Sequence, residues 1–323
     1  MTHFLIRRTF WALFLFFIAS LVTYVLFFVI PSDPAMLAAG KATTPQIVEQ
    51  IRHNMHLDLP VYQQYGLFVW NIVRHGDFGY SFVNGISVRD KLAAEIPVTA
   101  SIVFGGAILY LAIAIPTGII SALKPRSAPD RAGMIFVLFG VSAPSIWLGL
   151  MLLYIVGFKL GWTPINGYCG LLPTHQIGAC GGFWPWMSHL ILPWITLAIG
   201  SAALYTRLIR ANVMETLSED YVRTARAKGA SSQRVLVQHV LRNSMLQVVT
   251  ILGMDLGLLL GGALFIEVVF ALPGLGQEIL KANQRFDLPV IVGVTMFACL
   301  AVIVFNFIVD VLYAWLDPRI RLT

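Results

Sequence analysis

Few residues of this chain could do chemistry, and the clearest candidates are acids inside long apolar stretches. Asp255, Glu267 and Asp310 each lie in such a stretch. An ionisable group within a membrane is costly, so it is expected to line a path or to bind a partner. Glu267 and Asp310 fall near the ends of their stretches, where interfacial water lowers that cost, and both are predicted to be mainly structural. Asp255 is the candidate path residue: it could meet a cationic group of a substrate or pair with a base on a neighbouring helix.

Catalytic and nucleotide-binding patterns are absent from the sequence. The Gly40-Lys41 pair lacks the upstream glycine and the following Ser or Thr of a phosphate-binding loop. His53 and His56 could share a helix face, but no third metal ligand accompanies them, so surface positions are favoured. We therefore expect no catalytic residue, bound cofactor or metal in this chain. Any energy-consuming step would take place on another polypeptide.

Two of the three cysteines, Cys169 and Cys180, share the glycine-rich stretch NGYCGLLPTHQIGACGG. A disulfide between them is typical of an oxidising compartment and a short hairpin. The alternative is that two cysteines fall in one loop by chance, and the disulfide is the favoured interpretation. Cys299 lies inside an apolar stretch and is predicted to be a small packing residue.

The composition indicates an all-α integral membrane protein. Of the 323 residues, 58% are hydrophobic and 12% are charged, about half the charged fraction of a soluble domain. The apolar residues form blocks, and a helix needs about 20 of them to cross a bilayer core. Six transmembrane helices are predicted, over residues 9–30, 97–123, 132–157, 188–208, 246–268 and 290–314.

The basic residues predict the orientation of these spans. Most Lys and Arg residues lie in the N-terminal segment, in 124–131, in 207–242 and near the C-terminus, so these segments and both termini are predicted to be cytoplasmic. The net charge of +6 follows from this bias and does not indicate nucleic-acid binding. The first apolar run is longer than the core of a signal peptide and lacks a cleavage site, so it is expected to remain as a span.

Three regions follow from the spans. Residues 1–30 are the cytoplasmic N-terminus and first span, 31–95 a small helical extracytoplasmic cap, and 96–323 a five-helix core with a cytoplasmic loop at 209–245. In the cap, Thr44-Pro45 is typical of a helix start. A second amphipathic helix is expected to stop at Gly76.

Proline and glycine are expected to shape the spans. Pro116, Pro144 and Pro193 interrupt them, which suggests a bundle that bends or lines a path. In the fifth span, glycine recurs at every fourth position, and such a stripe lets another helix approach closely. Packing is favoured over a substrate contact, and the partner helix could belong to this chain or to another subunit. The stripe consists of Gly253, Gly257 and Gly261.

The segment 219–239, EDYVRTARAKGASSQRVLVQH, is the one long charged stretch between two spans. Thr216 and Glu219 fit a capping box at the start of a helix, where Asp220 is also favourable. Gly229 is expected to end this helix in a left-handed conformation. Either of the two serines that follow, at 231 and 232, would then begin a second helix leading to the fifth span.

This first helix presents a narrow apolar edge, formed by Tyr221 and Ala225, which are four residues apart. A helix of about ten residues is not stable alone in water, so something must receive that edge. One candidate is a surface of anionic lipid headgroups, because 207–242 holds seven bases and three acids. The other is a groove on a protein, which is favoured because Thr224 and Ala227 are small and suit close packing.

The stretch YVRTARAKGASSQRVLVQHVLRN resembles the cytoplasmic loop of permease subunits in binding-protein-dependent ABC importers, specifically the B-type subunits of the dipeptide, oligopeptide and nickel branch. Similar matches run along the chain: RRTFWALFLFFIASLVTYVLFFVIPSDPA, LDLPVYQQY, GDFGYSF, FALPGLGQEILKANQRFDLP and LDPRIR. The resemblance implies the type I importer permease fold and a multi-pass position in a bacterial cytoplasmic (inner) membrane.

The resemblance also implies partners. In such importers the short helix docks into a groove on an ATP-binding subunit, so two such subunits would hold ATP and Mg, a second homologous permease would complete a heterodimer, and an extracytoplasmic binding protein would deliver substrate. Membrane lipid surrounds the bundle. The residues implied in coupling are Glu219, Asp220, Tyr221, Arg223, Thr224, Ala225, Arg226, Ala227, Lys228 and Gly229.

The sequence departs from the family pattern at three places. Arg223-Thr224-Ala225 stand where the general pattern has Glu-Ala-Ala, so the glutamate contact of other importers is absent. Gln247 stands near an expected proline, and Phe286 separates an arginine from the aspartate of the outer loop. The last two departures leave the fold intact and make the details of the outer loop less transferable.

The implied function is uptake of short peptides by alternating access, with the 31–95 cap and the ALPGLGQ loop helping to receive the binding protein. Nickel or glutathione is the alternative cargo, because specificity usually resides in the binding protein. An ion-coupled secondary transporter is the alternative of another class, which typically shows inverted repeats and midplane ion ligands. No repeat is visible, and only Asp255 is a suitable ligand.

Overall fold

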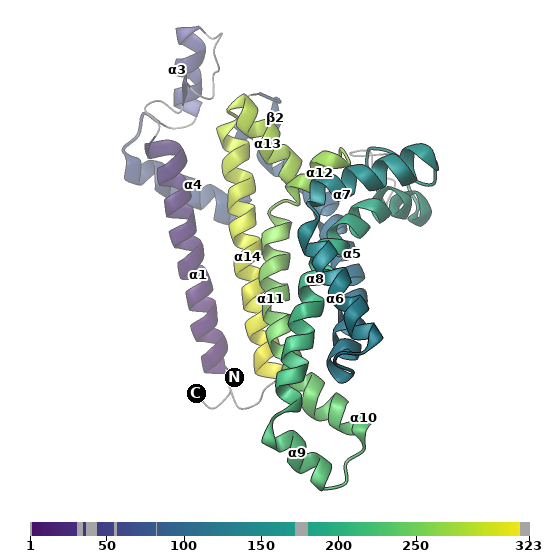
Figure 1. The fold of residues 1–323 in the computed structure, drawn as a ribbon. Coiled ribbons are helices and arrows are strands. Elements are labelled where there is room, and N and C mark those ends of the chain that lie inside the picture. The colour runs from purple at the N-terminus through teal and green to yellow at the C-terminus, as the bar shows by residue number, and fades with distance from the viewer. Residues whose placement is uncertain are drawn as a thin grey trace.

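The computed structural model describes residues 2–30, 35–36, 44–54, 57–81, 83–171 and 180–316, and within them the chain is almost entirely helical (Figure 1). The elements in chain order are α1 (Thr2–Tyr24), the π-helical η1 (Val25–Val29), α3 (Pro45–Asn54), α4 (Val61–His75), β1 (Tyr80–Ser81), β2 (Ile86–Ser87), α5 (Val88–Leu123), α6 (Ala128–Ser142), α7 (Ser145–Leu152), the π-helical η2 (Leu153–Lys159), α8 (Phe183–Leu217), α9 (Asp220–Ala227), α10 (Ser232–Arg234), the π-helical η3 (Val235–Leu241), α11 (Arg242–Leu260), α12 (Leu264–Val269), α13 (Leu275–Arg285) and α14 (Leu288–Leu316).

Five helical segments in the described part of the chain are long and apolar enough to cross a membrane. They are Ile6–Val29, Val88–Leu123, Phe183–Leu217, Ser232–Leu260 and Leu288–Leu312. They overlap five of the six predicted spans, so the fold class predicted from composition is confirmed. Ser232–Leu260 comprises α10, η3 and α11, which follow one another without a break.

The third predicted span, 132–157, is wrong as a straight helix. Ala128–Ser142 and Ser145–Lys159 are bent by 99° at the break between them, and together they make at most one broken span. The cause is Pro144: the residue before a proline is driven out of the helical region, and Ala143 is extended with φ −88° and ψ 118°. Pro116 and Pro193, by contrast, lie inside α5 and α8 without ending either helix.

The fifth span ends earlier than predicted. Helix α11 stops at Leu260, and the prediction that it continues to residue 268 is wrong because 264–268 belong to the separate helix α12. The break is a close backbone crossing: a Cβ atom on Gly262 would lie 2.6 Å from the Cα atom of Gly276. Gly262 also has φ +135°, a backbone conformation that residues with a side chain rarely adopt.

Helices α5 and α8 form the centre of the bundle and pack along their lengths. Gly106 and Gly118 of α5 face Leu197 and Ile209 of α8, and a Cβ atom on either glycine would collide with those side chains. The core around them is apolar and includes Ile209, Val213 and Val240, all fully buried. Dispersion and close packing can stabilise such an interface inside a membrane, where helices gain little from burial alone.

A buried ion pair joins α8 to α6 at the end of the bundle that carries α9. Arg210 Nε donates to Asp130 Oδ1 at 2.8 Å, and Arg210 Nη2 donates to Oδ2 at 3.2 Å. The same carboxylate accepts from the Ser121 hydroxyl and from the backbone N–H of Arg126. Asp130 is only 5% exposed. In the sequence, Arg210 served only as one of the bases that predict orientation, and its pairing with Asp130 was not predicted.

The segment before α5 contains the two predicted cap helices. Helix α3 begins at Pro45 as expected, and α4 ends at Gly76, which is left-handed with φ +60°. Helix α4 lies against α1, where the Tyr24 hydroxyl donates to Gln64 at 2.6 Å and the hydroxyls of Ser20 and Tyr65 lie 2.8 Å apart. The cap is therefore fastened to the first helix by polar as well as aromatic contacts.

The loop after α11 folds around a buried carboxylate, Glu267, which is 0% exposed. It accepts hydrogen bonds from the Thr99 hydroxyl at 2.8 Å and from the backbone N–H of Gln277 at 2.8 Å. A Cβ atom on Gly274 would lie 2.5 Å from the Glu267 carboxyl carbon, so the glycine-rich loop makes room for it. Burial raises the pKa of Glu267 above its ordinary value of 4.5, against the effect of these hydrogen bonds. Its predicted structural role agrees with these contacts.

Phe286, which departs from the family pattern, ends α13 in a left-handed conformation with φ +57°. This turn brings the Asp287 backbone N–H to the Ala282 carbonyl at 2.9 Å. The Asp287 side chain is buried and accepts from the Ser81 hydroxyl at 2.5 Å, which fastens β1 to the start of α14. The extra residue is therefore accommodated in the turn.

Candidate coupling site

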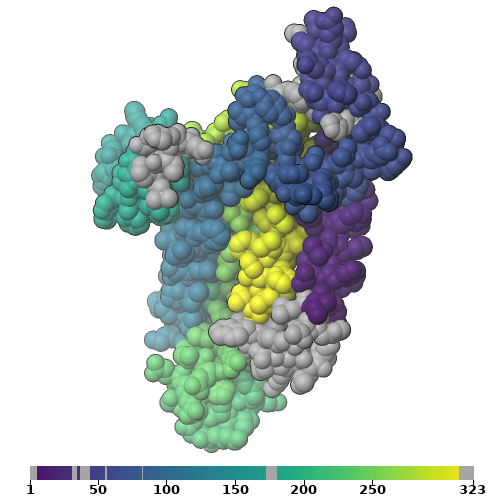
Figure 2. All heavy atoms as spheres, turned by 180° about the vertical axis from the view of Figure 1, so that it is seen from behind, coloured from purple at the N-terminus to yellow at the C-terminus, as the bar shows by residue number. Residues whose placement is uncertain are grey.

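The charged segment between α8 and α11 projects beyond one end of the bundle (Figures 1 and 2). Helix α9 runs across this end, and α10 turns back toward the bundle. In the space-filling view, the light green atoms of this segment form a protrusion below the helices. Its placement agrees with the predicted helix, corner and second helix.

The start of α9 differs from the predicted capping box. Thr216 is buried within α8, which continues to Leu217, so it cannot cap the next helix. Glu219 occupies the N-cap position, with φ −68° and ψ 146°, and its side chain makes no capping hydrogen bond. The helix therefore begins at Asp220, whose charge is favourable at the positive end of the helix dipole.

The end of α9 is a glycine corner of the expected kind. Gly229 has φ +81°, and its N–H donates to the Arg226 carbonyl at 2.9 Å. The N–H of Ala230 reaches back to the Ala225 carbonyl at 3.2 Å. These two bonds form the Schellman motif, which satisfies carbonyls at a helix end and favours glycine at this position. Ser231 then caps α10 by accepting from the Arg234 N–H at 3.4 Å.

Val222 is the main anchor of α9. It is fully buried and belongs to the core cluster that contains Val235 and Val240 of η3. Ala225 is partly buried against the same cluster, so this part of the edge that was predicted to face a partner packs on the chain itself, whereas Tyr221 is 41% exposed. The i, i+3 spacing of Val222 and Ala225 in the sequence could have identified the true edge.

The rest of α9 is open to a partner. Arg223 and Asp220 approach at 3.5 Å, but both side chains are highly exposed and such a pair contributes little stability. Within the described residues, the helix is held by its Val222 side and leaves its opposite side uncovered. The exposed members of the predicted coupling set are Glu219, Asp220, Tyr221, Arg223, Thr224, Arg226, Ala227, Lys228 and Gly229.

The glycine stripe of α11 packs against α14 of the same chain. A Cβ atom on Gly253 would lie 2.0 Å from the Val309 side chain, and one on Gly257 would lie 2.7 Å from the Val302 Cα atom. Gly261 faces Ala298 in the same way. The two helices therefore approach so closely that any side chain on the stripe would separate them.

Asp255 lies on the other side of α11. Two residues along a helix correspond to a rotation of about 200°, so Asp255 points away from the glycine stripe. Its Oδ2 accepts a hydrogen bond from the Tyr205 hydroxyl of α8 at 2.7 Å. None of the ion pairs found among the described residues includes it. By contrast, Asp310 pairs with Arg8 of α1 at 2.9 Å, as suits a structural acid.

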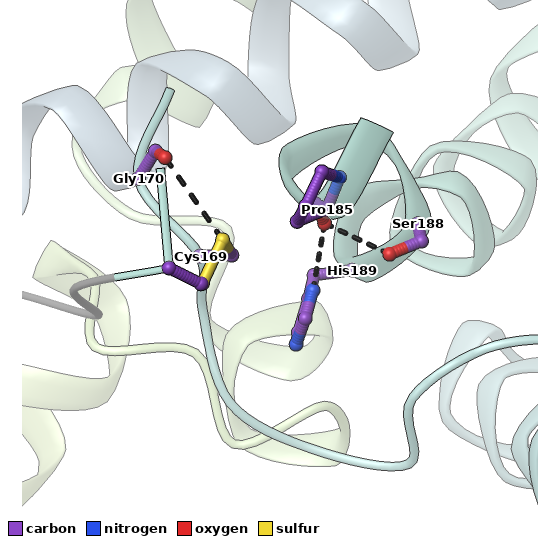
Figure 3. The surroundings of a disulfide bond; sticks show 6 residues. Cys169, Gly170, Pro185, Ser188 and His189 are labelled. Atoms are coloured by element: carbon purple, nitrogen blue, oxygen red, sulfur yellow. Dashed lines mark hydrogen bonds between the residues drawn. A yellow bond between two sulfur atoms is a disulfide. The ribbon is translucent and has the colours of Figure 1, made fainter. Parts of the chain in front are cut away.

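Cys169 and Cys180 are joined by a disulfide, with Cα atoms 5.6 Å apart and eleven residues apart in sequence. Figure 3 shows the bridge near the first turn of α8, where the Pro185 carbonyl accepts from Ser188 and His189, each at 2.8 Å. The intervening residues 172–179 lie outside the described residues. The bridge closes this loop beside α8.

In the described part of the chain, no three His, Cys, Asp or Glu side chains are grouped so that they could hold a metal ion. His53 instead lies 3.3 Å from Asp58. Its predicted neighbour His56 lies outside the described residues.

Comparison with known proteins gives two family matches. Residues 114–322 match the binding-protein-dependent transport system inner membrane component, and residues 1–103 match the N-terminal membrane component of such systems. Each match includes stretches that the sequence resemblance used.

Curated relatives align over nearly the whole chain. A protein of Brucella abortus (strain 2308), named for a peptide transport system permease, is 38% identical over 325 residues and 99% of each chain. The dipeptide transport system permease protein DppB of Escherichia coli K12 is 35% identical over 337 residues and 99% of each chain. The glutathione transport system permease protein GsiC of Escherichia coli O1:K1 is 36% identical over 321 residues, again with 99% of each chain covered.

These matches extend from the first helix through the α9 corner to α14. The chain therefore belongs to the family of inner membrane components of binding-protein-dependent transport systems, and it is an inner-membrane protein with the type I ABC importer permease fold.

Proposed function

We propose that this chain is the permease subunit of an ATP-driven importer that takes up short peptides by alternating access. The single observation that carries this proposal is the exposed side of α9, a short helix that is fixed to the bundle through Tyr221, Val222 and Ala225 and whose other residues are exposed within the described chain. The names of the relatives support peptides as the substrate class. Family membership favours this class over an ion-coupled secondary transporter.

Residues 219–229 would dock into a groove on an ATP-binding subunit. Because α9 lies between α8 and the continuous segment α10–η3–α11, movement of the docked helix would act on both. A coupling device must bind its partner in both states of the cycle, or ATP hydrolysis shifts no equilibrium in the permease. The three bases Arg223, Arg226 and Lys228 and the acids at the helix start would give the docking surface its specificity.

The partners and orientation follow from this assignment. Two ATP-binding subunits would hold ATP and Mg, and the chain itself would bind no cofactor and catalyse no reaction. A second homologous permease would complete a heterodimeric path. Both termini and the 209–245 loop would be cytoplasmic, and an extracytoplasmic binding protein would deliver substrate to the 31–95 cap and the loop around Glu267. Residues 96–323 would form the membrane core.

Site-specific crosslinking tests the docking surface. A photoreactive amino acid is placed at Arg226 of α9 in the assembled transporter, with Leu258 of α11 as the matched control because it is also exposed but lies within a span. We expect Arg226 to crosslink to an ATP-binding subunit and Leu258 to give lipid adducts. Lipid adducts alone at Arg226 would refute the coupling role.

A glutathione importer is the second candidate function, because GsiC is as similar to the chain as DppB is. Proteoliposomes containing the whole transporter and its binding protein separate the cargoes. ATP-dependent uptake of labelled dipeptides, a tetrapeptide, glutathione and nickel is measured side by side. Preferential uptake of short peptides supports the first candidate, and preferential uptake of glutathione or nickel replaces it.

A further inference from the structure

Three polar side chains from three helices meet near the middle of the bundle: Tyr110 of α5, Tyr205 of α8 and Asp255 of α11. Tyr110 and Tyr205 each lie about 20 Å from the end of their helix nearest α9, and Asp255 lies about 20 Å from the start of α11, at 1.5 Å per residue. A bilayer core is about 30 Å thick, so the three residues are at membrane depth.

Their contacts leave hydrogen-bonding capacity unused. Tyr205 donates to Asp255 Oδ2 at 2.7 Å, and the Tyr110 ring stacks on the Tyr205 ring with centroids 5.0 Å apart. Tyr110 is 1% exposed, and its hydroxyl has no hydrogen-bond partner among the described residues. A carboxylate has about four acceptor positions, of which Tyr205 fills one.

The charge of Asp255 is not compensated within the described chain. The nearest bases along α8 are not paired with Asp255: Arg210 forms an ion pair with Asp130, and Arg207 is exposed. A carboxylate at mid-membrane costs about 2.5–3.5 kcal/mol even by the lower scales. Asp255 is only partly buried. Its open side therefore has to face water or a cation, since acyl chains would leave the charge unsolvated.

We propose that Asp255, held by Tyr205 and accompanied by Tyr110, binds the protonated amine of the transported substrate. An ammonium has three N–H donors, which match the free acceptor positions of the carboxylate. Stacked phenol rings also attract cations. This assignment rests on the proposed peptide import, because every peptide with a free N-terminus carries such an amine at neutral pH.

The position of the site in the fold suits this role. Tyr205 lies on α8, which precedes α9, and Asp255 lies on α11, which ends the continuous segment that follows α9. Relative movement of α8 and α11 would change the Tyr205–Asp255 contact and with it the affinity for an amine. A base supplied by a second permease is the competing occupant, and the experiments below separate the two.

Thiol accessibility tests whether position 255 lies in an aqueous path. Asp255→Cys is made in a Cys299→Ser background, with Leu13→Cys of α1 as the control because Leu13 is exposed within another span. In the working transporter, we expect a small cationic thiol reagent to modify Asp255→Cys and saturating peptide to slow that reaction. Leu13→Cys should remain unmodified. Absence of modification at 255, or modification that peptide does not slow, would overturn the proposal.

Charge removal tests the amine directly. Asp255→Asn keeps the size and the hydrogen bond from Tyr205 but loses the charge, and Asp310→Asn is the matched control because that acid pairs with Arg8 instead. We expect Asp255→Asn to lower peptide uptake by about tenfold, with partial recovery in Asp255→Glu. Asp310→Asn should retain uptake within about twofold of the unmodified transporter.

Each outcome has a separate meaning. Unchanged uptake by Asp255→Asn would overturn the proposed amine site. Loss of the assembled complex in that variant would indicate that Asp255 pairs with a base on another subunit, which would also overturn the proposal. If the unmodified transporter takes up no peptide, the proposed function itself fails, whatever the variant does.

Discussion

Asn243 donates a hydrogen bond to the Tyr221 hydroxyl at 2.7 Å, across 22 residues of chain. The bond links α9 to the first turn of α11, so the exposed side of α9 is tied directly to a membrane helix. Val222 makes the second link, through the apolar core. Together the two contacts set the angle at which α9 leaves the bundle.

Asn243→Ala tests the polar link. The hydrogen bond is exposed, so its loss should cost about 1 kcal/mol or less of stability and leave the protein folded. We expect a lower ratio of peptide uptake to ATP hydrolysis in proteoliposomes, because α9 is then less firmly oriented. Tyr221→Phe keeps the ring and removes the same bond, so it should lower the ratio equally. An unchanged ratio in both variants would show that Val222 alone orients the helix.

Gly229 should be replaceable only by residues that tolerate a left-handed backbone. A Cβ atom at this position meets nothing within 4 Å, so Gly229→Leu introduces no clash and costs about 1–2 kcal/mol in backbone strain. We expect this variant to insert and fold but to hydrolyse ATP without matching uptake. Gly229→Asn is the control and should stay near normal, because asparagine adopts this conformation more readily. Normal uptake by Gly229→Leu would contradict the coupling role.

Glu267 predicts a pH dependence of stability. Because burial raises its pKa, the folded protein binds this proton more tightly than the unfolded chain does. Stability should therefore fall as pH rises above the ordinary carboxyl pKa of 4.5. Glu267→Gln cannot titrate, so its melting temperature in detergent should fall less over the same range. Parallel curves for the two proteins would show that the carboxylate is held ionised by its hydrogen bonds.

The disulfide predicts the reactivity of the three cysteines. In protein denatured without reductant, mass measurement after alkylation should find one labelled thiol, Cys299, and two more after reduction. Closing a loop of this length stabilises a fold by about 3 kcal/mol, so reductant should lower the melting temperature. A variant with both Cys169→Ser and Cys180→Ser should not respond to reductant. Three labelled thiols before reduction would exclude the bridge.

Much of this architecture is visible in the sequence where one local signal decides the structure. Of the six spans predicted from apolar block length, five coincide with long apolar helices, and Gly229 alone predicts the corner after α9. Pro144 was one of three prolines expected to interrupt or bend the spans, and only Pro144 ends its helix, with a 99° bend. The sequence does not show which of the three does so, because a proline inside an apolar block can either be tolerated, as Pro193 is, or end the helix. Packing against neighbouring helices decides between these outcomes, and the residues around the proline do not reveal that packing.

The contacts of the candidate site were harder to predict, because each depends on two segments far apart in sequence. Thr216 appeared to begin a helix, yet packing in the core keeps it inside α8. Tyr205 carries no sign of its pairing with Asp255, fifty residues away. Residue type predicted that Asp255 needs a partner, and only the packing of α8 on α11 identifies which one it has.

The unbroken segment Ser232–Leu260 has a mechanical consequence. Its 29 residues correspond to a length of about 44 Å, enough to carry a displacement from the α9 corner across the whole bilayer. The first backbone hinge along it is the glycine pair that follows Leu260, where the chain crosses Gly276 at close range. If an ATP-binding subunit displaces α9 as proposed, this segment would transmit the displacement to the loop that encloses Glu267, at the opposite end of the bundle.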